Sequence, residues 1–197
     1  MPQTTDFRNG LVAITKQALE LADHIPTPII LIDGRAGSGK SSFAEELRNE
    51  LFRQGDAAPS IIHMDDLYPG WEGLKAGSSY LIQNILQPLR AGNSANWQIW
   101  NWGNGVRGND SEPGNGWREF TGGNFLIVEG CGAISRQSRE IANLAVWIEA
   151  EGTSREARIQ SRDQGAFDEF WGVWQAQEDE FYETERSESL SDWRITN

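Results

Sequence analysis

Four short, almost continuously apolar segments divide the chain, and apolar residues recur at helical spacing between them. The short segments cover residues 29–32, 61–64, 125–128 and 144–148. Runs of this kind are typical of parallel strands that are buried on both faces of a sheet. The helical spacing covers residues 6–23, 43–51, 81–89, 153–163 and 167–186, and residues 192–196 are compatible with one more strand. Alternating strands and helices predict an α/β fold in which helices cover both faces of a parallel sheet.

Length and charge narrow the choice of partners. The 197 residues suffice for one compact domain, so we treat 1–197 as a single unit. A net charge of −12 disfavours nucleic acids and anionic membranes, both of which need a basic surface. No apolar stretch is long enough to span a bilayer and no export signal is evident, and the single cysteine cannot form an internal disulfide. These features predict a cytoplasmic protein with a small-molecule partner.

Tryptophans are concentrated where the rest of the sequence looks like a loop. Residues 91–118 are rich in Gly and Asn, yet they hold four of the nine tryptophans. A disordered linker would not carry so many large rings. Either an ordered excursion packs beside the site, or a surface loop has a small core of its own. The aromatic stripe in 167–186 (Phe167, Phe170, Trp171, Trp174, Phe181 and Tyr182) is most simply core packing. A homo-oligomer also stays open, because such faces suit subunit interfaces.

The strongest chemical signal is a glycine-rich loop between the first buried strand and the helix that follows it. It reads G-R-A-G-S-G-K-S, which matches the P-loop pattern G-x-x-x-x-G-K-[ST] in its required context. The loop amides can hold phosphate oxygens, Lys40 can neutralise the β- and γ-phosphates, and Ser41 can bind Mg²⁺. The predicted nucleotide-binding residues are Gly34, Arg35, Ala36, Gly37, Ser38, Gly39, Lys40, Ser41 and Ser42.

Carboxylates follow two of the predicted strands, at the edge where ligands bind in open α/β sheets. Glu129 closes a buried strand and is the candidate for a carboxylate near the metal, with a solvated strand end as the alternative. Asp65 and Asp66 follow another strand. One of them can act as general base in phosphoryl transfer, or the pair can cap a turn.

Three arginines occupy one face of a predicted helix. Arg155, Arg158 and Arg162 stand at positions i, i+3 and i+7. They can form a positive lid that stabilises charge on a transferring phosphoryl group. An exposed helix with ion pairs is the alternative. No guanine-reading motif and no apolar run ending in Asp-Glu is present, which disfavours GTPases and motor or transport ATPases.

Together these motifs resemble the uridine kinase-like branch of the P-loop kinases, and especially its short actinobacterial members. The segments that carry the resemblance are I-D-G-R-A-G-S-G-K-S-S, H-M-D-D-L-Y-P-G-W, L-I-V-E-G-C-G and R-E-A-R-I-Q-S-R-D. The resemblance runs from residue 29 to the C-terminus. It implies a three-layer fold with a five-stranded parallel sheet and an arginine-bearing helical lid, which we place at 153–165. We place the excursion at 91–118 on the acceptor side.

The resemblance also implies roles for individual residues. Asp65 matches the catalytic base, Tyr68 lies beside the acceptor pocket, and Glu129 matches the acidic residue near the metal. Arg155 is implied at the nucleotide, and Arg158 and Arg162 act with Lys40 in catalysis. The acceptor motif departs from the family, because Trp100 and Asn101 stand in W-Q-I-W-N-W where relatives carry tyrosine, arginine and aspartate. Trp100 and Asn101 remain the candidate acceptor contacts, and stacking on a flat or apolar acceptor is still feasible.

The leading hypothesis is an ATP- and Mg²⁺-dependent kinase that phosphorylates a hydroxyl of a small metabolite, such as a nucleoside. A second reading is a kinase for a sugar, a vitamin or a phosphorylated acceptor, although the acidity of the chain disfavours a highly anionic one. A third is a nucleotide-binding sensor that has lost phosphoryl transfer, which the altered acceptor motif would suit.

Overall fold

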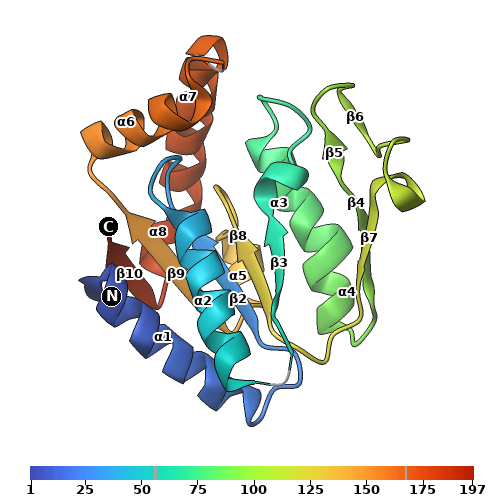
Figure 1. The fold of residues 1–197 in the computed structure, drawn as a ribbon, viewed down its shortest axis with the longest axis vertical. Coiled ribbons are helices and arrows are strands. Elements are labelled where there is room, and N and C mark those ends of the chain that lie inside the picture. The colour runs from blue at the N-terminus through green and yellow to red at the C-terminus, as the bar shows by residue number, and fades with distance from the viewer. Residues whose placement is uncertain (56, 167) are drawn as a thin grey trace.

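A six-stranded parallel sheet forms the centre of the molecule. The computed structural model describes residues 1–55, 57–166 and 168–197. The strand order across the sheet is β1 (Gln3–Asp6), β10 (Trp193–Thr196), β9 (Leu144–Glu149), β2 (Ile29–Asp33), β8 (Leu126–Glu129) and β3 (Ser60–His63) (Figure 1). All neighbouring pairs are parallel. The predicted parallel α/β architecture is confirmed.

The sheet has six strands instead of the five that the family resemblance implied. The additional strand is β1, which pairs with β10 in the register Gln3 to Trp193. Its sequence, Gln-Thr-Thr-Asp, contains no apolar residue, and three of its four residues are exposed. An edge strand that pairs on one side only does not need a hydrophobic face, so the apolar pattern could not reveal it.

Hydrophobic clusters on both faces of the sheet make the three layers. Alternate residues of β2 point to opposite faces, so Ile30 and Ile32 pack with one cluster and Leu31 with the other. The first face is covered by α1 (Phe7–Ala22) and α2 (Lys40–Gln54). The second is covered by α3 (Leu74–Leu81), the π-helical turn η2 (Ile82–Leu86), α4 (Gln87–Arg90), α5 (Arg136–Arg139), α7 (Asp168–Glu185) and α8 (Ser187–Leu190).

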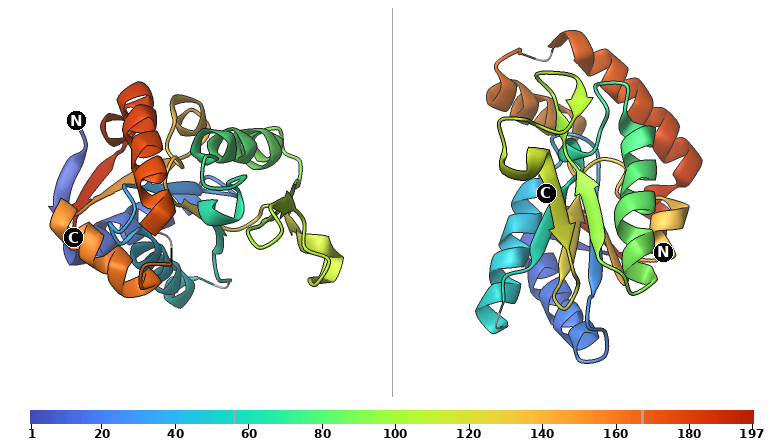
Figure 2. Two further views of the ribbon diagram at one scale, coloured as in Figure 1. Left: turned by 90° about the horizontal axis from the view of Figure 1, so that it is seen from above. Right: turned by 90° about the vertical axis from the view of Figure 1, so that its right-hand side faces the viewer.

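The excursion at 91–118 is ordered and packs on the main core of the domain, with no separate core of its own among the described residues. Strand β4 (Ala95–Gln98) pairs with β7 (Trp117–Phe120), and β5 (Trp100–Asn101) pairs with β6 (Val106–Arg107), with a 3-10 turn η3 (Pro113–Gly116) between them. In both views of Figure 2 this unit lies at the side of the sheet that carries α3 and α4. Trp97 is buried in the core, whereas Trp102 is 41% exposed and reaches the cleft described below.

Arg107 fastens the excursion to the rest of the domain. Its guanidinium donates to the carbonyl oxygens of Leu67 (2.9 Å) and Gln98 (3.2 Å). It also stacks on the Tyr80 ring, 3.5 Å from the centroid. These contacts place the β5–β6 hairpin next to the chain that follows β3.

Two helices rise above the carboxyl ends of the central strands. Helix α6 (Gly152–Asp163) follows β9 and faces the loop between β2 and α2, and α7 crosses behind that loop (Figure 1). Both were predicted in nearly the observed ranges; Phe167, the first member of the predicted aromatic stripe, lies outside the described residues. Among the residues that are described, no helix has the length and apolar character needed to cross a membrane.

Candidate functional site

A cleft of about 890 Å³ opens at the carboxyl ends of β2, β3 and β8. Its walls come from the glycine-rich loop with the start of α2, the chain after β3, the β5–β6 hairpin, the end of β8, helix α6 and helix α7. Lys40, Ser41, Asp65, Tyr68, Glu129, Arg158 and Arg162, all predicted from the sequence as site residues, are among the residues that line it. The topology therefore brings together side chains that are up to 122 positions apart in the sequence (40 to 162).

The glycine-rich loop has the backbone that its sequence predicts. Gly34, Gly37 and Gly39 have φ angles of 149°, 77° and 101°, in the region that favours glycine. The Lys40 ammonium lies inside the loop and donates to the Arg35 carbonyl oxygen at 3.0 Å. Burial alone would lower the pKa of Lys40, but negative groups around it, including Glu129, raise that pKa. Lys40 therefore stays positively charged where phosphate oxygens would lie.

Glu129 connects the first turn of α2 to the neighbouring strand β3. Its carboxylate, 5% exposed, accepts a hydrogen bond from Ser41 Oγ, with oxygen distances of 3.2 and 3.1 Å. Its Oε1 also lies 2.6 Å from His63 Nδ1. This hydrogen bond raises the pKa of His63. The pair of side-chain oxygens, one hydroxyl and one carboxylate, matches the hard donors that Mg²⁺ prefers.

Asp65 lies in a 3-10 turn, η1 (Met64–Asp66), two residues after β3 ends at His63. Its side chain opens onto the cleft, whereas Asp66 is not among the cleft-lining residues. Asp65 is exposed to solvent at the cleft, and partial desolvation there raises its pKa, with Glu129 adding to the effect. Lys40 and Arg162 oppose it. The Asp65 backbone carbonyl accepts a hydrogen bond from Trp102 Nε1 at 2.9 Å.

The three arginines of α6 face the loop and the cleft. Arg155 donates to the Ala36 carbonyl (3.3 Å), and Arg158 donates to the carbonyls of Gly37 and Ser38 (both 3.2 Å). Arg162 lines the cleft and influences the titration of Asp65. The predicted lid helix thus lies against the glycine-rich loop, with its positive charges toward the phosphate-binding side.

The predicted acceptor contacts fall in different places. The Tyr68 ring lines the cleft, while its hydroxyl donates to the Cys131 carbonyl at 2.6 Å and is buried. Trp100 and Asn101 are not among the residues that line the cleft. Asn101 instead caps the β5–β6 hairpin, because its Oδ1 accepts hydrogen bonds from Gly103 N and Asn104 N. A direct contact of Trp100 or Asn101 with an acceptor stays a prediction.

Solved structures similar to this one agree with the architecture. A "possible uridine kinase" from Bacillus stearothermophilus has a TM-score of 0.66 at 17% identity, with 95% of this chain and 98% of that chain covered. A "putative fructose transport system kinase" from Silicibacter sp. TM1040 has a TM-score of 0.59 at 16% identity, with the same coverage of the two chains. The chain has the uridine kinase-like P-loop kinase fold. No protein-family model and no curated protein matches it.

On this kinase-like fold, sequence reasoning missed the aromatic wall of the cleft. Trp71, Trp102, Trp171 and Trp174 line it together with Tyr68. Trp71 contacts Trp102 with ring centroids 5.1 Å apart, and Trp174 at 6.2 Å in an edge-to-face arrangement. Trp71 follows the Asp65 motif directly in H-M-D-D-L-Y-P-G-W, which was an available signal. The position of Trp102 depends on the hairpin, which no local pattern specifies.

Sequence reasoning also missed three polar residues. His63 was interpreted as structural, yet it touches the carboxylate that faces Ser41. Asp33 and Glu178 were not singled out, and both are completely buried beside the glycine-rich loop. Burial raises the pKa of Asp33 to about 6. Glu178 stands between Trp174 and Phe181 in the predicted aromatic stripe. A charged residue at such a position is rarely buried without a partner, so it was an available signal of a buried polar contact.

Proposed function

We propose that this protein is an ATP- and Mg²⁺-dependent kinase that transfers the γ-phosphoryl group to a hydroxyl of a small metabolite. The observation that carries the proposal is the convergence of three groups on one cleft: Lys40 in a P-loop, the Ser41–Glu129 oxygen pair, and Asp65 in the turn after β3. Phosphoryl transfer needs a phosphate cradle, a metal and a group that orients the attacking hydroxyl.

The residues present fit a magnesium ion and a nucleoside triphosphate. Ser41 Oγ and the Glu129 carboxylate would hold Mg²⁺, directly or through its waters, and Mg²⁺ would offset charge on the β- and γ-phosphates when bound. Among the described residues there is no cluster of three or more His, Cys, Asp or Glu that could hold a metal.

Asp65 is positioned to act on the acceptor. As the hydroxyl oxygen bonds to the γ-phosphorus, the bond from that phosphorus to the β–γ bridging oxygen breaks, and its electron pair leaves with ADP. The hydroxyl proton passes to the Asp65 carboxylate. Desolvation raises the pKa of Asp65, which makes it a better proton acceptor than a solvated aspartate. Arg158 and Arg162 would stabilise the charge on the transferring group.

The aromatic wall suggests what the acceptor resembles. Trp102 and Trp171 lie on the same cleft as Asp65, so the hydroxyl would be carried by a flat or weakly polar body that packs on rings, as in a nucleoside. A sugar, vitamin or phosphorylated acceptor is the second enzyme reading. Weak support for a kinase of that kind comes from the fructose transport system kinase among the similar structures.

The decisive experiment is ATP consumption across a panel of nucleosides, sugars and vitamins. We expect turnover with at least one acceptor, loss of about 10²-fold or more in Asp65→Asn, and near-normal turnover in Asp66→Asn. Asp66 is the matched control because it stands next to Asp65 but does not line the cleft. Full activity of Asp65→Asn would exclude the base assignment.

A nucleotide-binding sensor is the alternative from a different class. The observation that favours it is that Trp100 and Asn101, which stand at the family's acceptor motif, are not among the residues that line the cleft, and that Asn101 accepts a hydrogen bond within the hairpin instead. Tight binding of Mg·ATP without turnover on any member of the panel would support the sensor over the kinase.

A further inference from the structure

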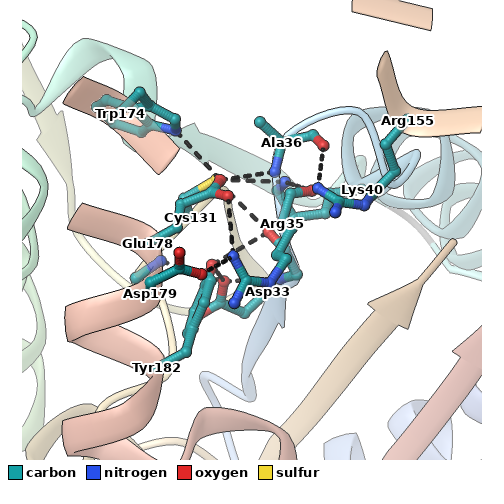
Figure 3. A network of polar contacts seen from close by, with 12 residues as sticks. Asp33, Arg35, Ala36, Lys40, Cys131, Arg155, Trp174, Glu178, Asp179 and Tyr182 are labelled. Carbon is teal, nitrogen blue, oxygen red and sulfur yellow. Dashed lines mark hydrogen bonds and ion pairs between the residues drawn. The ribbon is translucent and has the colours of Figure 1, made fainter. Parts of the chain in front are cut away.

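Glu178, on helix α7, contacts the backbone of the glycine-rich loop. Its side chain is completely buried. Oε1 accepts hydrogen bonds from Ala36 N of the loop (2.7 Å), from Cys131 Sγ after β8 (3.1 Å) and from Trp174 Nε1 (3.2 Å). Oε2 lies 3.6 Å from a guanidinium nitrogen of Arg35. Figure 3 shows these groups converging on one carboxylate.

A buried carboxylate is expensive unless donors surround it, so its position needs an explanation. A nonpolar residue would suffice for packing, and a buried ion pair is weak evidence of stabilisation. Here two groups of donors belong to other segments of the chain, residues 35–36 and Cys131, and Trp174 lies one turn earlier on the same helix. Glu178 therefore links α7 to the phosphate-binding loop and to the chain after β8.

Neighbouring residues of α7 hold the loop in the same way. Asp179 pairs with Arg35 at 2.6 Å. One turn after Glu178, the Tyr182 hydroxyl donates to Asp33 Oδ1 at 2.8 Å, and Asp33 accepts further hydrogen bonds from the amides of Gly34 and Ile134. Helix α7 thus contacts the loop at residues 33 to 36, before the turn that encloses Lys40 (Figure 3).

We propose that Glu178 is a positioning residue for the nucleotide phosphates, which it affects through the backbone of Ala36. The proposal rests on the proposed function, in that the loop is taken to bind Mg·ATP. The hydrogen bond from Trp174 to Glu178 also connects the aromatic wall of the cleft to this carboxylate. The Trp174 ring packs against Tyr68 with centroids 4.8 Å apart, and both rings line the aromatic wall of the cleft. The aromatic wall on the acceptor side of the cleft is therefore connected to the glycine-rich loop through Trp174 and Glu178.

The test measures the affinity of a nonhydrolysable ATP analogue with Mg²⁺, so no acceptor is required. Glu178→Gln keeps the shape but removes the charge from the hydrogen bond to Ala36. We expect its Kd to rise about tenfold, which corresponds to about 1.4 kcal/mol. Glu180→Gln is the matched control, because Glu180 is exposed on the same helix. Its Kd should equal that of the wild type.

Trp174→Phe keeps a ring and removes the N–H donor to Glu178. We expect a smaller increase in Kd, of a few-fold, and in the double variant a Kd no higher than that of Glu178→Gln alone, because both changes act through one carboxylate. A purely structural role would lower the free energy of unfolding in urea without changing Kd after correction for the folded fraction. If Glu178→Gln does not fold, the Kd of Trp174→Phe decides.

The outcomes separate the two proposals. If the wild-type protein binds the analogue and Glu178→Gln binds it equally well, the positioning role alone is overturned. If Glu178→Gln does not fold, unchanged affinity in Trp174→Phe has the same meaning. Wild-type protein that does not bind the analogue would overturn the proposed kinase function and, with it, the positioning role. Raised Kd values in Glu178→Gln and Trp174→Phe, with the Kd of Glu180→Gln unchanged, would support the positioning role.

Discussion

His63 shares a short contact with Glu129, so the charge beside the Ser41 hydroxyl depends on pH. The hydrogen bond to Glu129 raises the pKa of His63 above its ordinary 6.5. The stabilisation from this pair is fully present below 6.5 and is lost as the pH rises through the raised pKa. Protonated His63 also offsets the negative charge that would attract Mg²⁺. We expect the Mg²⁺ concentration for half-maximal nucleotide binding to fall as the pH rises above 6.5.

The variant His63→Gln isolates this effect. Gln cannot become charged, so the part of the pH dependence that comes from His63 should disappear and the variant should bind Mg²⁺ more tightly than the wild type at low pH. Protonation of ATP contributes equally to both proteins and cancels in the comparison. Identical pH profiles for the two proteins would show that His63 does not modulate the metal site.

The site residues that could be predicted from the sequence are those that a motif or the end of a predicted strand marks locally. Lys40 and Ser41 follow from the motif, and Glu129 follows from its place at a strand end; all three line the cleft. His63 and Glu178 could not be assigned, because their roles depend on partners 66 and 142 positions away. Nothing in the nearby sequence records which residue such a side chain will meet.

At the scale of elements, helix α6 lies in close contact with the glycine-rich loop. A Cβ atom on Gly37 would lie 2.5 Å from the Arg155 carbonyl oxygen, and the φ angle of Gly37 is 77°. Gly37→Ala would therefore suffer both backbone strain and a clash. Gly92 has a φ of 78° with nothing within 4 Å, so Gly92→Ala suffers the strain alone.

We expect Gly92→Ala to lower the free energy of unfolding by about 1–2 kcal/mol, the cost of a left-handed residue with a side chain. Gly37→Ala should lose more, and it should also bind nucleotide more weakly because α6 has to move away from the loop. Urea unfolding and analogue binding measure the two effects. Equal losses of stability in both variants would mean that α6 does not press on the loop.

Elements whose buried face is apolar were predicted, and a helix whose buried face is partly small and polar was not. The buried strands and α1, α2, α6 and α7 follow from their apolar patterns. The helix at 74–80 was not predicted, although its buried residues Leu74, Gly77, Ser78 and Leu81 stand at helical spacing. Two of these four are Gly and Ser, which a search for apolar residues passes over. Gly77 lies against the Tyr68 ring, where a Cβ would come within 2.5 Å, so a small residue is needed at that contact.

The whole molecule carries a charge of −12, and the cleft is lined by acidic as well as basic residues, but Lys40 and Arg158 lie directly at the glycine-rich loop where phosphates would bind. At about 0.01 M salt the Debye length is ~30 Å, so an approaching nucleotide meets the net negative field; at about 0.15 M it is ~8 Å, so the nucleotide meets mainly the local positive groups. We therefore expect the association rate constant of a fluorescent ATP analogue, measured by stopped flow at fixed free Mg²⁺, to rise several-fold over this range. Uncharged adenosine should associate at a rate that salt does not change. An association rate constant for the ATP analogue that falls with salt would mean that the field of the cleft extends beyond the acidic surface, and that nucleotides are attracted from a distance.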